Sequence, residues 1–199
     1  MTMADETNSL ADVPSPFREA LVARGFADLT LVQKAVLEAS VEGVDLRVSS
    51  QTGSGKTAAF VLPMLQRLSG SIDRSSPRKI RGLVLAPTRE LAIQIAERCE
   101  VYGREMPLRH VVIFGGVSQH RQEVALRAPT DIVIATPGRL LDLMQQGILR
   151  LNNVEFLVLD EADRMLDMGF VRDVRKICAE LPSTRQTLLF SATMPQAVA

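Results

Sequence analysis

A short segment that combines glycines, hydroxyl side chains and one lysine has the composition of a phosphate-binding loop. It reads Ser50-Gln51-Thr52-Gly53-Ser54-Gly55-Lys56-Thr57 and follows an apolar stretch. Glycines let successive backbone N–H groups turn inward around phosphates, and the helix that follows adds a favourable dipole. Lys56 would reach the outer phosphates, and the Thr57 hydroxyl would bind Mg²⁺. The first position departs from the common pattern, because Ser50 stands where glycine or alanine is usual.

Two carboxylates close a second apolar segment about a hundred residues downstream. Phe156-Leu157-Val158-Leu159 leads directly into Asp160 and Glu161. At the carboxyl end of a parallel strand, Asp160 can face the phosphate loop and hold Mg²⁺, directly or through water. Glu161 is placed to orient and deprotonate an attacking water. There are simpler alternatives: the first segment could be a glycine-rich turn with an incidental lysine, and the acidic pair could be the solvated start of a helix. The presence of both segments in one chain favours an ATP site.

The elements that must position these groups follow a regular rhythm. Short, β-branched apolar runs alternate with longer stretches of helical spacing, which indicates an α/β fold with a mainly parallel central sheet and helices on both faces. The predicted strands are Asp45–Ser49, Gly82–Ala86, His110–Phe114, Asp131–Ala135, Glu155–Asp160 and Thr187–Ser191, and clear helices are Thr57–Leu68, Glu90–Glu100 and Phe170–Leu181.

The amino-terminal part is less regular. Residues 1–14 are polar and aperiodic, so a mobile lead-in is expected there. Ser15 is interpreted as an N-cap, with Pro16 opening a helix that runs to Arg24. A second helix is predicted from Thr30 to Val41. Residues 69–81, rich in serine and basic side chains, are expected to form an exposed loop.

Composition narrows the function classes. The 23 basic and 23 acidic residues balance, so any nucleic acid must be held by a local groove and not by a basic coat. No apolar run approaches the roughly 18 residues of a membrane span, and no secretory signal opens the chain, so a cytoplasmic protein is expected. Neither cysteine and neither histidine has ligand-forming neighbours, and Cys99 and Cys178 are predicted to be reduced core residues.

Several motifs resemble those of one family. Asp160-Glu161-Ala162-Asp163 is the signature of DEAD-box RNA helicases, and the chain resembles their first RecA-like domain, of the bacterial type. The other matching motifs occur in family order from about residue 15 to residue 199: Pro87-Thr88-Arg89-Glu90-Leu91-Ala92, Gly115-Gly116, Thr136-Pro137-Gly138-Arg139 and Ser191-Ala192-Thr193.

The resemblance implies a role for each matching residue. The loop of residues 50–57 binds ATP with Mg²⁺, Asp160 holds the hydrated metal and Glu161 positions the water. Ser191 and Thr193 resemble the element that hydrogen-bonds with Asp163 and couples hydrolysis to strand separation. Contacts to the RNA backbone, independent of base sequence, are implied for Thr88, Arg89, Gly116, Thr136 and Arg139.

The adenine-reading segment matches the family less closely. Gly25-Phe26 and Gln33 are present, whereas Leu29 and Leu31 replace two prolines of the family pattern. The amide of Gln33 can offer one donor and one acceptor to the adenine edge. No aromatic residue stands at the expected upstream position, where Leu10 lies nearest. Adenine selection through Gln33 and Phe26 is expected, while an aromatic stack on the base has no clear candidate.

Family members continue into a second RecA-like domain whose arginines face the γ-phosphate, and no such arginine motif occurs in these 199 residues. An arginine finger contributes about 10³–10⁵ in rate, so this chain by itself is expected to bind ATP or ADP as a monomer with almost no hydrolysis or unwinding.

Two other functions are possible alternatives. One is a P-loop kinase or transporter ATPase, but these proteins lack the Ser-Ala-Thr and Thr-Pro-Gly-Arg motifs. The other is a scaffold for a partner protein, which would need no intact catalytic acids.

Overall fold

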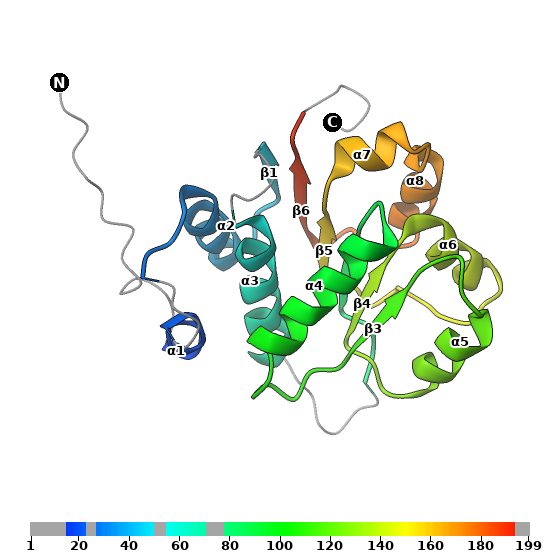
Figure 1. Ribbon diagram of the computed structural model, residues 1–199, viewed down its shortest axis with the longest axis horizontal. Coiled ribbons are helices and arrows are strands. Elements are labelled where there is room, and N and C mark those ends of the chain that lie inside the picture. Colours follow the sequence, from blue (N-terminus) through cyan, green and yellow to red (C-terminus); the bar gives the residue numbers. More distant parts are fainter. Residues whose placement is uncertain (1–14, 23–26, 50–54, 71–77, 194–199) are drawn as a thin grey trace.

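The central sheet contains six parallel strands. The computed structural model describes residues 15–22, 27–49, 55–70 and 78–193. Its strands lie in the order β1-β6-β5-β2-β4-β3 (Figure 1). Their bounds are β1 Leu46–Ser49, β2 Gly82–Leu85, β3 His110–Ile113, β4 Ile132–Ala135, β5 Phe156–Leu159 and β6 Gln186–Ser191. Every strand expected from the apolar runs is present, within a residue or two at each end.

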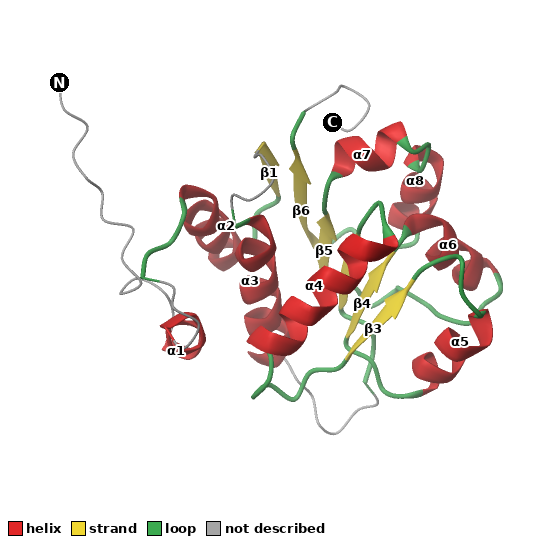
Figure 2. Cartoon of the chain, in the orientation of Figure 1, coloured by secondary structure: helices red, strands yellow, loops and turns green. Residues whose placement is uncertain are grey.

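Helices cover both faces of the sheet (Figure 2). One core lies under α1 Ser15–Val22, α2 Leu31–Glu42, α3 Lys56–Gly70 and α4 Arg89–Tyr102. The other lies under α6 Pro137–Gln145, α7 Ala162–Asp167 and α8 Val171–Ala179, while α5 Gln119–Arg127 flanks β3 at the sheet edge. Side chains alternate along a strand between the cores, since Leu83 joins the second and Val84 the first. The predicted α/β architecture is confirmed.

Two sequence-based boundaries need correction. Ser15 is the first residue of α1 and not a cap before it, and residues 23–26, where that helix was expected to end, lie outside the described residues. The expected loop at residues 69–81 starts too early, because α3 continues through Ser69 to Gly70. The Ser69 hydroxyl donates to the Gln66 carbonyl at 2.9 Å, so this serine satisfies its side chain within the helix.

Polar side chains connect the strands at their amino ends. Arg81, just before β2, bridges Glu155 before β5 at 3.2 Å and Asp131 before β4 at 3.4 Å. The nearly buried Asp131 carboxylate also accepts from Arg78 at 2.7 Å and from the Arg109 backbone N–H at 2.9 Å. Each oxygen of this buried charge therefore has donors, as burial requires. These contacts fix the relative register of four neighbouring strands from one edge.

Two further polar residues lie at the amino ends of β1 and β6, on the other side of the sheet from β3. Asp45, before β1, accepts from the Thr187 backbone N–H of β6 at 2.6 Å. Gln186, the first residue of β6, donates its backbone N–H to the Glu155 carbonyl at 3.0 Å. We call Asp45, Arg81, Asp131, Glu155 and Gln186 the amino-edge polar row. It spans the whole sheet on the side away from the segments predicted to carry chemistry.

Candidate active site

The predicted chemical motifs gather at the carboxyl ends of the strands. The strand order places β1, β6 and β5 side by side (Figure 1). Ser49, which ends β1, pairs with Ser191 at the end of β6, and Leu189 of β6 pairs with Leu159 at the end of β5. The phosphate loop, the Ser-Ala-Thr segment and the acidic pair thus leave three adjacent strands, although about 140 residues separate the first two in the chain.

The described part of the phosphate loop begins at Gly55. Residues 50–54, expected to cradle phosphates, and Phe26, expected near the base, lie outside the described residues. Lys56 and Thr57 form the first turn of α3, with Lys56 8% exposed. Gly55 has φ +81°, and a Cβ there would lie 2.6 Å from Nε2 of Gln33. A glycine is therefore required both by the backbone angle and by the close approach of Gln33.

Gln33 joins the start of α2 to that loop. Thr30 caps the helix, accepting from the Gln33 N–H at 3.3 Å, while its own N–H donates to Oε1 of Gln33 at 2.9 Å. Nε2 of Gln33 donates to the Gly55 carbonyl at 3.3 Å, and the residue is 1% exposed. The amide expected to read adenine is thus buried and hydrogen-bonded to Thr30 and Gly55.

The two leucines that replace family prolines have different environments. Leu29 is buried and packs in the core beneath α2 and α3, so its role is structural. Leu31, the first residue of α2, is 76% exposed beside Thr30. A proline would suit the first helical position sterically, and leucine leaves an apolar side chain in solvent there.

Asp160 is a buried carboxylate next to a lysine. It is 3% exposed, and burial raises its pKa to about 6, although the nearby Lys56 ammonium acts to lower that pKa. The Glu161 N–H donates to Oδ1 of Asp160 at 3.0 Å. A buried carboxylate oxygen close to Lys56 suits Mg²⁺, which typically takes one or two carboxylates together with substrate phosphates. The residues present therefore fit that metal.

Glu161 has an unusual backbone. Its φ of 52° and ψ of 52° lie in the left-handed region, and it alone among the non-glycine residues described has a positive φ. Such a conformation is strained for a side chain of this size and persists where surrounding structure enforces it. It caps α7 and pairs with Arg164 at 3.2 Å. The strain at the residue expected to position water is consistent with a functional site.

Asp163 ties the acidic motif to the end of β6. Its Oδ2 accepts from the backbone N–H groups of Ala192 and Thr193 at 3.1 and 3.0 Å and from the Thr193 hydroxyl at 3.3 Å. Its own N–H donates to Oγ of Ser191 at 3.1 Å. Partial burial acts to raise the pKa of Asp163. The hydrogen bonds from Thr193 and Ser191, together with one from the backbone N–H of Arg164, outweigh this effect and lower the pKa below its ordinary value. The hydrogen bonds expected from the resemblance are present.

Comparison with known proteins agrees with this arrangement. A family model described as DEAD/DEAH box helicase matches residues 30–199. The chain belongs to this family. It is 43% identical to the DEAD-box ATP-dependent RNA helicase CshA of Streptococcus pneumoniae over 98% of this chain and 35% of that protein. It is 45% identical to the ATP-dependent RNA helicase CshA of Listeria monocytogenes over 87% of this chain and 32% of that protein.

A solved structure supports the same assignment. A DEAD box protein from the hyperthermophile Methanococcus jannaschii aligns with a TM-score of 0.85 and 37% identity, covering 94% of this chain and 50% of that one. The DEAD/DEAH box domain described here spans about a third of the length of the curated relatives it matches. No helix in its described part is long and apolar enough to cross a membrane.

The other three strands of this DEAD/DEAH box domain carry the segments expected to contact RNA. Thr88, after β2, caps α4 by accepting from the Leu91 N–H at 3.2 Å. Arg89 is half exposed, pairs with Glu90 at 3.3 Å and lies over the Phe114 ring, 5.9 Å from its centroid. Thr88 therefore has a structural role as a helix cap, whether or not it also contacts a ligand. The Arg89 side chain is accessible from solvent.

The glycine loop after β3 meets the start of α6 after β4. Gly116 has φ +80° and open space where a Cβ would be, so it offers backbone without a side chain. Both terminal nitrogens of Arg139 donate to the Val117 carbonyl at 3.4 Å. Thr136, the residue before α6, is buried, so its hydroxyl is less accessible than the arginines. Arg139 is thus held beside the residue that follows Gly116.

Sequence reasoning missed a residue that holds this loop. Gln122 of α5 is buried and makes two hydrogen bonds to the backbone of Phe114. Its Nε2 donates to the Phe114 carbonyl at 2.9 Å, and its Oε1 accepts from the Phe114 N–H at 3.1 Å. The only available signal was a glutamine in a weakly amphipathic polar segment, which does not distinguish it from a solvated residue. Gln122 fixes the backbone directly before Gly115 and Gly116.

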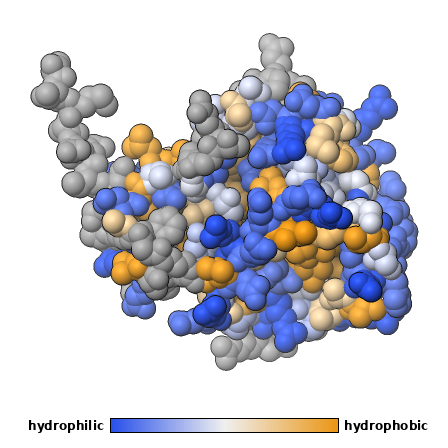
Figure 3. All heavy atoms as spheres, in the orientation of Figure 1, coloured by the Kyte–Doolittle hydropathy of each residue, from blue (hydrophilic) through white to orange (hydrophobic). Residues whose placement is uncertain are grey.

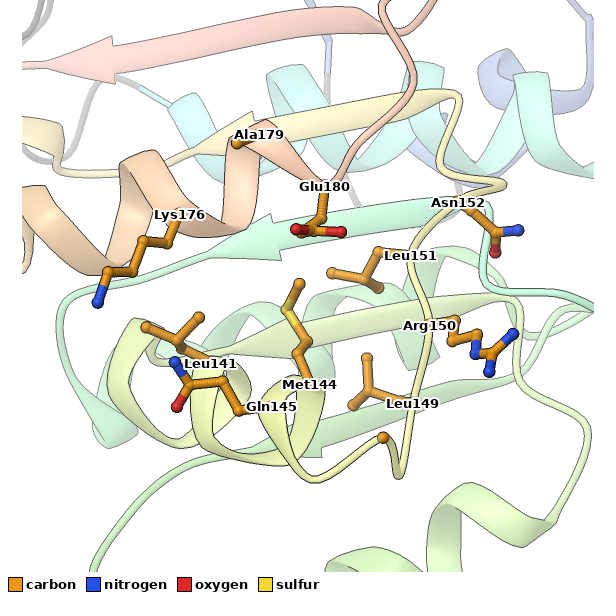
Figure 4. A pocket seen from close by; sticks show the side chains of 11 residues that line it. Leu141, Met144, Gln145, Leu149, Arg150, Leu151, Asn152, Lys176, Ala179 and Glu180 are labelled. Carbon is orange, nitrogen blue, oxygen red and sulfur yellow. The ribbon is translucent and has the colours of Figure 1, made fainter.

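A separate pocket of about 710 Å³ lies away from this edge, between α6 and α8 (Figure 4). Met144 and the buried Leu149 and Leu151 form its apolar floor, and it is also lined by Lys176 of α8 and by Glu180, which directly follows that helix. The pocket is built by the end of α6 and the segment leading into β5, so it takes no part in the nucleotide site. The face shown in Figure 3 is mainly hydrophilic with smaller apolar patches, as the balanced composition suggests.

The described histidine, cysteine and acidic residues offer few possibilities for binding a metal through side chains alone or for thiol reactivity. Within the described ranges, no three His, Cys, Asp or Glu side chains cluster in a way that could hold a metal ion. Both cysteines are free thiols; Cys99 is buried in the core as expected, whereas Cys178 is only half-buried against the second core. Burial raises the pKa of Cys99 to about 12 and also raises that of Cys178. Burial disfavours the reactive thiolate form of both side chains.

Proposed function

We propose that this chain is the ATP-binding part of an RNA helicase, which binds ATP or ADP with Mg²⁺ and contacts the backbone of single-stranded RNA. The observation that carries the proposal is the grouping of Lys56, Asp160 and the Asp163–Ser191–Thr193 hydrogen bonds at the ends of three adjacent strands. A fold used only as a scaffold would not need a buried carboxylate beside a lysine, because burying that charge lowers stability.

Each group has a chemical task in this proposal. Lys56 and the loop of residues 50–57 bind the phosphates, while Thr57 and Asp160 supply oxygen atoms for the metal. When bound, Mg²⁺ neutralises charge that develops on the phosphates. Glu161 accepts a proton from the attacking water. Gln33 selects adenine through its amide, and Phe26, seven residues earlier in the chain, contacts the base.

RNA binding is proposed for the half of the edge formed by β2, β4 and β3. Arg89 and Arg139 supply cationic groups, Thr88 and Thr136 supply hydroxyls, and Gly116 allows close approach of a phosphate. Contacts of this kind do not read bases, so RNA is expected to bind without sequence preference. Few phosphates are contacted, hence the affinity should fall only moderately with salt.

Full turnover is proposed to need a second RecA-like domain. The curated relatives extend to about three times the length of this chain, which leaves room for one. With an arginine finger contributing about 10³–10⁵ in rate, the 199-residue chain is expected to bind nucleotide as a cytoplasmic monomer and to hydrolyse it hardly at all. RNA-stimulated ATP turnover by this chain alone would contradict this part of the proposal.

Nucleotide titration tests the site. Calorimetry with ADP and Mg²⁺ should show binding to the wild type and at least tenfold weaker binding to Lys56→Ala and Gln33→Ala. Lys176→Ala is the matched control, since Lys176 is an exposed lysine on α8, away from the nucleotide edge, and should leave the affinity unchanged. If neither test substitution weakens ADP binding, the assignment of the site is wrong.

A further inference from the structure

Gln186 is a buried polar residue with no role in the proposed nucleotide or RNA contacts. It opens β6 and is 1% exposed. Its Nε2 donates to the Ala39 carbonyl at 3.0 Å and to the Val44 carbonyl at 2.6 Å. Its Oε1 accepts from Nη1 of Arg67 at 2.9 Å. Both donor positions of the amide are used at the end of α2 and its oxygen accepts from α3, which is a demanding arrangement for a single side chain.

Those segments are the far ends of the two helices that form the nucleotide site. Ala39 and Val44 lie at the end of α2, whose first turn contains Gln33. Arg67 lies in the last turn of α3, whose first turn contains Lys56. At their other ends the same two helices meet through the bond from Gln33 to the Gly55 carbonyl. A helix moves largely as a rigid body, so holding one end of α2 sets where the other end lies.

We infer that Gln186 is a positioning residue for adenine recognition. By fixing α2 against α3 and β6, it determines where the Gln33 amide stands relative to the phosphate loop. This inference rests on the proposed function, because it assumes that Gln33 reads the base. Guanine presents a carbonyl where adenine presents an amino group, so discrimination depends on the position of one amide to within a fraction of an ångström.

A purely structural role predicts something different. Removing Gln186 would then lower thermal stability and weaken all nucleotides alike. A positioning role predicts a change in the ratio of GDP to ADP dissociation constants, since phosphate contacts are common to both and cancel. Asp131→Asn is the matched control: Asp131 is also a buried member of the amino-edge polar row, but its partners are Arg78, Arg81 and Arg109, away from α2.

The test measures ADP and GDP binding to the 199-residue chain by calorimetry, with thermal unfolding recorded for each variant. Gln186→Leu is expected to reduce the preference for ADP about tenfold, which corresponds to about 1.4 kcal/mol. Asp131→Asn should lower the unfolding temperature and keep the preference within twofold. Gln186→Glu retains the acceptor for Arg67 and loses both donors, so its preference should fall as in Gln186→Leu.

Each outcome decides something distinct. If the wild type shows no preference for ADP, the proposed function fails. If the wild type prefers ADP and folded Gln186→Leu or Gln186→Glu keeps that preference, the positioning role is wrong while the proposed function stands. Should both Gln186 variants fail to fold, Arg67→Met removes the donor that orients the amide. A reduced preference in that variant supports the inference, and an unchanged one overturns it.

Discussion

Replacing Asp160 by asparagine should stabilise the nucleotide-free domain at neutral pH. Burial raises the pKa of Asp160 from its ordinary value of 3.8 to about 6. Each pKa unit corresponds to about 1.4 kcal/mol, so the ionised carboxylate destabilises the fold by about 3 kcal/mol at pH 8. Asparagine has nearly the same shape, can still accept the Glu161 N–H and carries no charge to bury.

The sign of the pH dependence follows from the raised pKa. The contribution of Asp160 to stability is fully present below pH 3.8 and is lost as the pH rises through about 6. Urea unfolding in the presence of a chelator should therefore give Asp160→Asn an advantage of up to about 3 kcal/mol at pH 8 that shrinks towards pH 4.5. A gain that is absent at pH 8, or equal at both pH values, would refute the account of this site.

A control and a functional readout complete the experiment. Asp167→Asn removes an exposed carboxylate that terminates α7, so its stability should stay within about 0.5 kcal/mol of the wild type. Asp160→Asn should also lose the dependence of ADP affinity on Mg²⁺. A variant that is more stable yet cannot use the metal would show that the carboxylate is held in place at the expense of the fold.

Three further substitutions test other parts of the site. Glu161→Gly should stabilise the domain by about 1 kcal/mol in urea unfolding, because glycine adopts the left-handed backbone without strain; a loss of stability would contradict that reading. Gln122→Leu should weaken single-stranded RNA binding severalfold, measured by fluorescence anisotropy, and leave ADP affinity unchanged, since it frees the Phe114 backbone at the RNA half alone. Because its pKa is lowered, Asp163 should keep its hydrogen bonds until the pH falls below its ordinary pKa of 3.8, which a carboxyl NMR titration can check; a midpoint at or above 3.8 would count against them.

The sequence predicted the strands well for a physical reason. In a parallel sheet covered on both faces, the central strands are apolar and buried throughout, as β2, β4 and β5 are, and such runs contrast sharply with their surroundings. The edge strand β1 alternates between half-buried and exposed residues, so its signal is weaker. The same geometry explains why the motifs could be placed, since every strand of such a sheet delivers its following loop to one edge. The hydrogen bonds of Asp163 with Ser191 and Thr193 are a direct result.

Other features left no local trace in the sequence. The order of the strands, and hence which motifs are neighbours, depends on packing across the whole sheet. Gln186 finds its partner Ala39 at a separation of 147 residues, and nothing in a run of Gln-Thr-Leu-Leu predicts that pairing. The left-handed backbone of Glu161 was equally hidden, because glutamate is not a residue that favours it. The end of α3 was misjudged because serine is common in loops and helix termini alike.

The amino-edge polar row has a consequence for how such a domain can be altered. Because the strands are aligned from the edge that carries no chemistry, the loops at the opposite edge need not hold the sheet together. Insertions and exchanges in those loops can therefore be accepted without a shift of register. Substitutions in those loops are therefore expected to change ligand contacts at a smaller cost in stability than substitutions in the amino-edge polar row, where buried polar groups would lose their partners.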